Sequence, residues 1–309
     1  MRQATPLIAL ASIASAALFI SIPGGVGTGS LMVHFVQLPL VYVGLTLGLW
    51  SFSLGSLAAT VMVGLFTGGI AAAVFVLVEV GPGLITVRHA LLWRQGQGGT
   101  KEWFPLGMIL DRLLLYVLAA GFALLLWWQW QTGDIGAAMV VIVDDMAGRM
   151  GNSEIAMKVH DLYRGLVPVL PGLAAAGLLL VSVINAALAF KLAAWQQGSI
   201  RPNEPLRRFE LSGWYIPALM VVIAGSMFVG GDAGFFLRTA LMLLATAFLL
   251  VGLALVHSLA ARWITDGLGR RALLTVFYFA LALFSLVAVP AVAALGLVED
   301  RAQLRRKMS

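Results

Sequence analysis

One carboxylate stands out among the residues that could do chemistry in this sequence. Glu79 lies inside the apolar run 69–93 and is followed almost at once by Gly81, Pro82 and Gly83. An ionisable group at the centre of a membrane-spanning helix costs at least about 2.5 kcal/mol unless it is paired, protonated or in contact with water. Proline between two glycines favours a helix break that frees backbone carbonyls for binding. We therefore expect a ligand- or cation-facing carboxylate. The alternative is a protonated or hydrogen-bonded glutamate beside a structural kink.

Three more polar side chains lie within or at the start of apolar segments. Asn185 and His257 lie inside long apolar runs, and Gln37 lies near the start of another. We predict that they join Glu79 around a cavity near the middle of the membrane. For Asn185 and His257 the alternative is a hydrogen bond between helices, worth only about 0.6 kcal/mol on average in membranes. For Gln37, as for its neighbour His34, the alternative is an interfacial position with nothing to bind.

Other chemistry is largely excluded. The chain has no cysteine, so disulfides, thiolate metal sites and cysteine nucleophiles are ruled out. The acidic residues of 131–165 match no calcium-loop spacing. No Ser–His–Asp set, His-x-x-x-His motif or pair of catalytic carboxylates is evident. We predict no enzymatic activity, no cofactor and no metal. The net charge of +6 indicates contact with anionic lipid and a preferred orientation in the bilayer, and argues against nucleic-acid binding.

Long apolar helices must position these residues. With 61% hydrophobic residues, 11% charged residues and a mean hydropathy of +0.96, the chain has more apolar surface than a soluble fold can bury. A span needs about 20 helical residues to cross a core of roughly 30 Å. We predict an all-α polytopic membrane bundle of eight to nine spans, in a single domain over residues 1–309. The segments are 5–22, 31–50, 52–66, 69–93, 106–130, 166–195, 214–229, 237–263 and 272–297, with a tight connection at 51–53.

Tryptophans and basic residues set the boundaries and the orientation. All nine tryptophans lie at predicted span ends, where an indole prefers to sit. Lysine and arginine concentrate in the loops near 88–112, 191–208 and 262–271, which predicts that these loops and the N-terminus are cytoplasmic. The acidic loop 131–165 is then extracytoplasmic and its carboxylates are expected to be solvated. Nine spans would place the basic tail 298–309 on the outside, against the same rule.

Two features suggest contact with a partner protein. Ser12 and Ala16, four residues apart on the first span, allow close helix approach and predict a docking face. The alternative is ordinary packing within the chain. Arg305 and Arg306 in the basic tail are expected to contact lipid headgroups or a partner.

The C-terminal third resembles the YybS-like family of bacterial inner-membrane proteins. The similarity lies in residues 252–260 (GLALVHSLA), in the helix from Pro290 to 295–300 (LGLVED) and in 304–306 (LRR). Residues 102–107 (EWFPLG) resemble the cytoplasmic loop of that family. The resemblance implies a multi-span protein and a distant kinship with substrate-binding subunits of energy-coupling-factor vitamin transporters. It brings no site residue with it, although His257 is the one polar membrane residue within a matching motif. The kinship would make Ser12 and Ala16 docking residues for a coupling subunit.

Together these features predict a protein of the bacterial inner membrane that binds or transports a small solute as part of a larger assembly. The predicted partners are the lipid bilayer, a small-molecule ligand and a membrane protein. The competing class is a membrane scaffold that does not transport and docks a protein through its Arg-rich loops and tail. An intramembrane enzyme ranks third.

Overall fold

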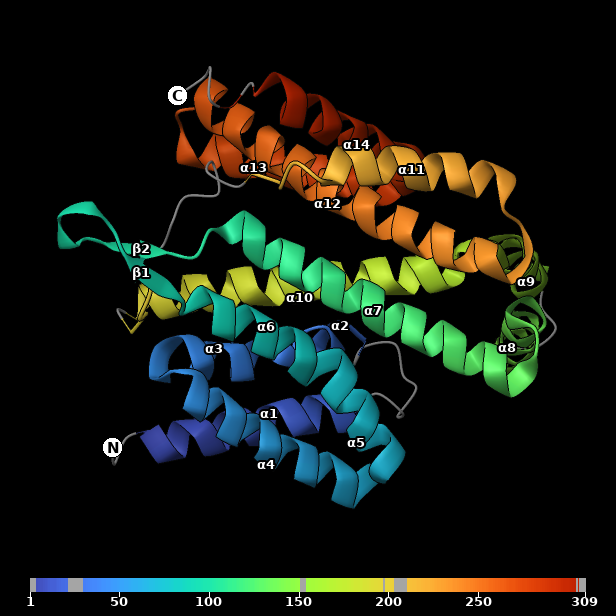
Figure 1. Cartoon of the computed structure of the whole chain (residues 1–309), viewed down its shortest axis with the longest axis horizontal. Helices are drawn as coiled ribbons and strands as arrows, with labels where there is room; N and C mark the ends of the chain where they lie inside the picture. The colour runs from blue at the N-terminus through green and yellow to red at the C-terminus, as the bar shows by residue number, and fades with distance from the viewer. Residues whose placement is uncertain are drawn as a thin grey trace. The chain divides into compact units, whose positions relative to one another are not determined.

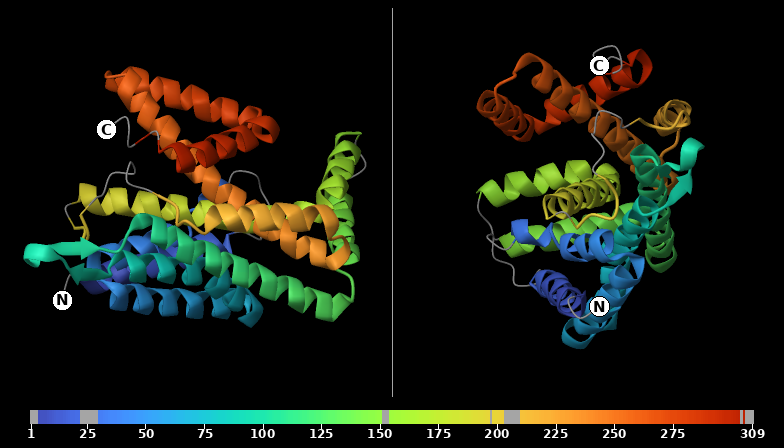
Figure 2. Two further views of the ribbon diagram at one scale, coloured as in Figure 1. Left: turned by 45° about the horizontal axis from the view of Figure 1, so that its top comes forward. Right: turned by 90° about the vertical axis from the view of Figure 1, so that its left-hand side faces the viewer.

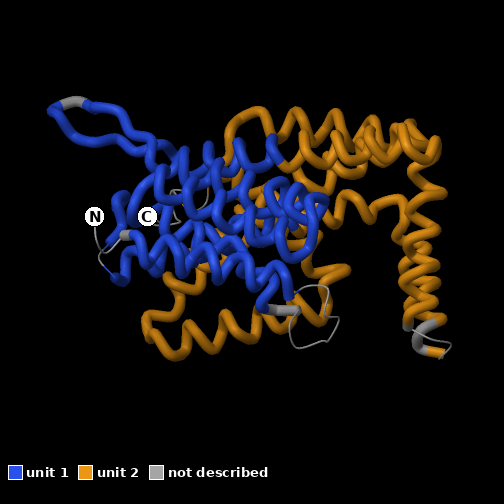
Figure 3. Tube along the Cα trace, turned by 90° about the horizontal axis from the view of Figure 1, so that it is seen from below, with its two compact units in different colours: residues 1–116, 178–208 blue, residues 117–177, 209–309 orange. Residues whose placement is uncertain are grey.

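The chain folds almost wholly as α-helices (Figure 1). The computed structural model describes residues 4–21, 30–150, 154–196, 198–202, 210–303 and 305. The chain divides into two compact units, drawn in different colours in Figure 3. Unit 1 comprises residues 1–116 and 178–208, and unit 2 comprises residues 117–177 and 209–309. The single domain expected over 1–309 stays a prediction.

Unit 1 holds the first helices and a small β-hairpin. Antiparallel strands β1 and β2 pair Trp93 with Trp103 and Arg94 with Glu102, within the basic loop predicted near 88–112. Helices α1, α3 and α4 pack together, and α6 lies against α3 and α4. The elements are α1 (Ala4–Ile20), α2 (Ser30–Val33), α3 (Gln37–Leu47), α4 (Leu49–Thr67), α5 (Gly69–Phe75), the π-turn η2 (Val76–Val80), α6 (Gly81–Ala90), β1 (Trp93–Gln95), η3 (Gln97–Gly99), β2 (Lys101–Trp103), and parts of α7 (Leu106–Thr132) and α10 (Leu170–Trp195).

Two glycines make the sharp turns around α4. Gly48 has a φ of 97° and Gly68 has a φ of 96°, a region that only glycine enters without strain. Each donates its N–H to the carbonyl four residues earlier, Gly44 and Gly64 respectively. The connection expected at 51–53 is therefore wrong: the turn is at Gly48, and the serines lie inside α4. They remain helical because each hydroxyl, Ser51 to Leu47 and Ser53 to Leu49, donates to the carbonyl one turn back.

Unit 2 is centred on the long helix α12. Its apolar core near the α7–α8 connection contains Leu125, Ile135, Met139, Val143 and Phe235. The acidic loop expected over 131–165 consists largely of two helices, α8 and α9. The elements are the rest of α7 and α10, α8 (Ile135–Met150), α9 (Glu154–Leu166), η4 (Val167–Val169), α11 (Tyr215–Phe228), α12 (Gly231–Trp263), α13 (Gly267–Leu283) and α14 (Ser285–Ala302).

Helix α14 crosses α12 at backbone distance. A Cβ atom at Gly252 would lie 2.0 Å from the carbonyl oxygen of Val292, and one at Gly296 would lie 1.8 Å from that of Phe248. Because lipid provides no hydrophobic drive for helix association, close van der Waals contact through glycine is a main source of packing energy in membranes. The crossing therefore depends on the missing side chains of both glycines.

The last apolar segment is not one straight helix. Helices α13 and α14 meet at Phe284 with a bend of 120°, whereas a single crossing was expected over 272–297. Figures 1 and 2 show α14 turning back toward the end of unit 2 at which α13 begins. Helix α14 therefore ends at Ala302 near the end of unit 2 at which α13 begins.

The span count differs from the expected eight to nine, which is not confirmed. Within the described residues five helices are long and apolar enough to cross a membrane, and the bent pair α13–α14 would be a sixth. The five are Leu49–Thr67, Gly69–Ala90, Leu106–Thr132, Met157–Trp195 and Gly231–Trp263; the apolar helices Thr5–Ile20, Gln37–Leu47 and Tyr215–Phe228 are shorter. An 11-residue helix such as α3 covers about 17 Å, roughly half of a hydrocarbon core.

Gly296→Ala should lower the unfolding temperature of the protein in detergent, because its new Cβ overlaps the Phe248 carbonyl. Overpacking of this kind costs about 1–3 kcal/mol. Gly177→Ala in α10 is the matched control: an added Cβ there meets no neighbouring group within 4 Å, so the change should be neutral or slightly stabilising. Thermal unfolding followed by tryptophan fluorescence measures both. Equal unfolding temperatures for the two variants would contradict the close crossing.

The bend at Phe284 also fixes the side of the C-terminus relative to the turn that follows Trp263. A reporter active on only one side of the membrane should give the same result when fused after residue 309 as when inserted in the turn at residues 264–266. Opposite results would show that α13 and α14 together complete one crossing.

Candidate binding site in unit 1

Pro82 determines the backbone structure around Glu79. An α-helix bonds each N–H to the carbonyl four residues earlier, so Pro82, which has no N–H, cannot serve the carbonyl of Val78. The N–H of Gly81 instead bonds to Val76, five residues back. In this five-residue pattern, residue 82 would donate to the carbonyl of Leu77. Because Pro82 has no N–H, that carbonyl is also left without a backbone donor. The result is a single π-turn, a feature often found at functional sites.

The helix break expected at Gly81, Pro82 and Gly83 is wrong. Gly81 has helical angles (φ −59°, ψ −56°), and α6 continues through Pro82 and Gly83 to Ala90. Proline is tolerated within a membrane helix when neighbouring groups satisfy the carbonyls that it releases. The disturbance is therefore a π-turn preceding the proline, and Glu79 lies within that turn.

Two side chains from elsewhere in unit 1 bond the released carbonyls. The Tyr116 hydroxyl donates to the Leu77 carbonyl at 2.7 Å. The Gln37 Nε2 donates to the Val78 carbonyl at 3.0 Å and to Ser182 Oγ at 3.1 Å. Gly81 makes the first contact feasible, because a Cβ there would lie 2.0 Å from the Tyr116 hydroxyl. Helices α3, α7 and α10 thus meet at the π-turn.

Glu79 is buried and has a neutral hydrogen-bond partner. Its side chain is buried, as are Gln37 and Ser182, and Gln37 provides a side-chain hydrogen bond to its carboxyl group. None of the ion pairs between described residues involves Glu79. A buried carboxylate needs a nearby positive charge or a bound proton to be stable. The neutral Gln37 provides neither.

Asn185 continues the polar surface along α10, one turn beyond Ser182. It is fully buried, and its Nδ2 donates to the carbonyls of His34 at 2.6 Å and Val181 at 2.8 Å. Its Oδ1 is buried and has no hydrogen-bond partner among the described residues. A buried acceptor left unpaired costs about 1–3 kcal/mol, which makes this oxygen available to a ligand donor.

The predicted site residues therefore fall into two groups. The structure brings Glu79 and Gln37 together at the π-turn, with Asn185 one turn along the same helix interface. His257 belongs to unit 2, where its Nε2 lies 2.8 Å from the Tyr278 hydroxyl of α13. It thus takes part in a contact between helices, which was the alternative interpretation.

Ser182 and Tyr116 are site residues that sequence reasoning missed. Ser182 could have been found, because it precedes Asn185 by three residues on an apolar helix and the two therefore share a face. Tyr116 carries no such signal. Only the structure shows that its hydroxyl reaches a carbonyl 39 residues earlier in the chain.

The residues expected to dock a partner are engaged within the chain where they are described. Ser12 and Ala16 are buried in unit 1, where an added Cβ at Gly55 of α4 would lie 3.4 Å from Ser12 Oγ; these small residues serve packing within the chain. Arg305 is buried, and its Nε donates to Glu299 Oε1 at 2.8 Å. Arg306 lies outside the described residues.

No protein-family model, curated protein or solved structure matches this chain. The resemblance to the YybS-like family stays a prediction. The function has to be inferred from the cluster around Glu79.

Tyr116→Phe should destabilise the protein by about 1–2 kcal/mol, because it leaves the Leu77 carbonyl unpaired away from water. Tyr163→Phe on the exposed side of α9 removes the same hydroxyl without this effect and is the control. Pro82→Ala restores an N–H at the π-turn, so it should recover part of the loss in the Tyr116→Phe background. Unfolding temperatures of the wild type, Tyr116→Phe, Pro82→Ala and the double variant form a double-mutant cycle. A coupling free energy of zero between positions 82 and 116 would contradict the proposed role of Tyr116 at the π-turn.

Proposed function

We propose that this protein binds a small, positively charged solute within the membrane and acts as the binding component of a transporter, with Glu79 as the recognition residue. The observation that carries the proposal is the burial of Glu79 at a π-turn among neutral hydrogen-bonding side chains. Buried ionisable residues in membrane helices mark ion, proton or substrate paths by default.

Charge balance indicates the class of ligand. The side chain that bonds the Glu79 carboxyl group is the Gln37 amide, which also donates to Ser182, and an amide does not neutralise a carboxylate. A cationic ligand supplies the missing charge when it is bound, and a proton supplies it when the ligand leaves. Binding is therefore expected to release a proton from Glu79 and to weaken as the pH falls.

Hydrogen bonding indicates what else the ligand carries. The free Oδ1 of Asn185 is an acceptor, so it suits an N–H or O–H group of the ligand rather than a carbonyl. Ser182 Oγ accepts from Gln37 and can donate its own hydrogen. A small amine with a second polar group fits these donors and acceptors better than a hydrophobic cation.

The alternative is a membrane scaffold that docks a protein partner through its Arg-rich loops and tail. Within the tail, the Arg305 side chain is buried against Glu299, which favours the binding component. We retain the bacterial inner membrane and the cytoplasmic N-terminus as parts of the proposal, on the strength of the basic loops. Kinship with energy-coupling-factor subunits would be consistent with a binding component but supplies no residue of this site.

Glu79→Gln should abolish stabilisation by cationic solutes while leaving the unliganded protein as stable or more stable, because it removes the cost of burying an ionisable carboxyl group. The probes are sodium, potassium, ethanolamine and spermidine, added to the detergent-solubilised protein in a thermal-unfolding assay at several pH values. Glu102→Gln in the exposed β-hairpin pair with Arg94 is the control and should behave as wild type.

Native mass spectrometry of the same preparation identifies any molecule that is retained. A ligand shift of equal size in wild type and Glu79→Gln would remove Glu79 from the site. Retention of a protein partner, with no small molecule retained and no solute-dependent stabilisation, would favour the scaffold.

A further inference from the structure

The hairpin formed by α8 and α9 has a different orientation from the rest of unit 2. Figures 1 and 2 show both helices running crosswise to the long helix α12, at the end of the unit where α7 finishes. Figure 3 shows the same crosswise segment from below. Because α12 is long enough to span the membrane, a helix lying across its end runs along the membrane surface.

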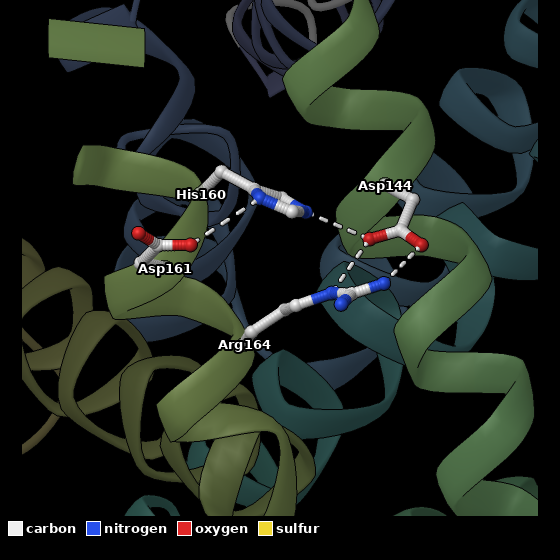
Figure 4. A network of polar contacts seen from close by, with 4 residues as sticks. All are labelled: Asp144, His160, Asp161 and Arg164. Carbon is white, nitrogen blue, oxygen red and sulfur yellow. Dashed lines mark hydrogen bonds and ion pairs between the residues drawn. The ribbon is translucent and has the colours of Figure 1, made fainter. Parts of the chain in front are cut away.

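The contact between α8 and α9 is polar. Asp144 accepts hydrogen bonds from Arg164 Nε at 3.0 Å and Nη2 at 2.8 Å, and His160 Nε2 lies 2.8 Å from the same carboxylate (Figure 4). Asp161 approaches the other ring nitrogen of His160 at 3.8 Å. Hydrogen bonds from Arg164, and then from His160, lower the pKa of Asp144 to about 2. The carboxylate is therefore ionised throughout the neutral range.

The remaining cations of the hairpin are also paired. Arg149 binds Asp145 at 2.7 Å and Lys158 binds Glu154 at 2.6 Å, so all three basic residues between 135 and 166, Arg164 included, have an acidic partner. Exposed pairs of this kind add little stability. They do mean that the hairpin has no unpaired basic residue for binding anionic lipid specifically.

Apolar residues form a stripe that extends past the core. On α8, Ile135, Met139 and Val143 are buried against the ends of α7 and α12. At helical spacing the same face continues to Met146, which is 49% exposed. The face that covers the ends of the spanning helices is the face turned toward the membrane, so Met146 lies on the membrane side beyond the edge of the bundle.

Helix α9 shows the same continuity. Val159, Leu162 and Leu166 follow each other at spacings of three and four residues and lead to Val167, which belongs to the same core. Leu162 is 62% exposed. An amphipathic helix whose polar side is engaged and whose apolar side is uncovered is typical of the membrane–water interface.

We propose that the α8–α9 hairpin lies in the membrane–water interface, with Met146 and Leu162 inserted among the lipids at the boundary between headgroups and acyl chains. The lipid is the occupant because the apolar stripe is continuous with the core at the ends of membrane-spanning helices. The last turns of α7 contain Trp127, Trp128 and Trp130. Because indoles prefer the headgroup region, these residues place the connection between α7 and α8 at the depth of the lipid headgroups. Zwitterionic lipid suffices, because the basic residues are already paired.

The absence of cysteine allows a direct test with single spin labels in the full-length chain. Met146→Cys and Leu162→Cys place labels on the stripe, and Val141→Cys is the matched control. Val141 is also apolar and 67% exposed, but two residues before Val143 it lies on the opposite face of α8. Each labelled protein is reconstituted in phosphatidylcholine vesicles, after checking that its unfolding temperature equals that of the parent.

Accessibility to oxygen, which concentrates in lipid, is compared with accessibility to a water-soluble nickel chelate. We expect labels at 146 and 162 to favour oxygen at a depth of about 5–10 Å, and the label at 141 to favour the nickel chelate. Adding phosphatidylglycerol should leave the depths unchanged. Water exposure at 146 and 162 equal to that at 141 would overturn the proposal. Protection of these labels from both reagents would overturn it in favour of a protein partner. Spectral broadening between labels on two copies of the chain would overturn it in favour of a second copy.

Discussion

Backbone hydrogen bonding without water is the constraint on which unit 1 depends. Inside a bilayer an unsatisfied carbonyl costs several kcal/mol, and Pro82 releases the carbonyls of Leu77 and Val78. The chain satisfies both with side chains from other helices, Tyr116 and Gln37. These bonds tie α3 and α7 to a single turn of the α5–α6 helix. The position of Glu79 follows from them, because the turn that they stabilise is the turn that contains it.

Glycine makes these contacts geometrically feasible in both units. At Gly81 it lets a tyrosine hydroxyl reach the backbone, and at Gly252 and Gly296 it lets two helix backbones touch. In a soluble protein such helices would be pressed together by the hydrophobic effect. In lipid the gain comes from van der Waals contact and hydrogen bonds, so the positions that lack a side chain are as important to packing as the large apolar residues around them.

The sequence indicated the apolar helices and the unusual carboxylate, and it failed where packing between distant segments decides the structure. The runs 106–130 and 237–263 were expected from hydropathy alone, and α7 and α12 cover them. Phe284 sits in an uninterrupted apolar run with no glycine or proline at the bend. The reversal there accompanies the crossing of α14 over α12 at Gly252 and Gly296, a contact that local propensity does not encode.

In the candidate site, too, some residues could be found from the sequence and others only from contacts between distant segments. Gln37 and Asn185 could be singled out because polar side chains are rare in apolar runs, whereas the role of Tyr116 depends on a contact between distant parts of the chain. The expected helix break also rested on a local rule, that proline interrupts a helix. Tertiary hydrogen bonds override that rule when they replace the missing donor. The resulting π-turn keeps the helix continuous, but it interrupts the regular backbone hydrogen bonds over a single turn.

The cluster at Glu79 is costly for stability, and this cost is the reason we propose a function for it. A leucine or glutamine at position 79 would avoid burying a carboxyl group, and an unpaired Asn185 Oδ1 adds a second unmet requirement one turn away. Elsewhere in the described chain the polar groups of the α8–α9 hairpin are matched acid to base, so the chain is able to pair its charges. Functional sites commonly retain such destabilising features, because a ligand must find groups that the protein itself has not satisfied. The contrast between a hairpin with paired charges and a buried carboxyl group with no ion pair among the described residues is therefore our strongest reason to propose a ligand at Glu79.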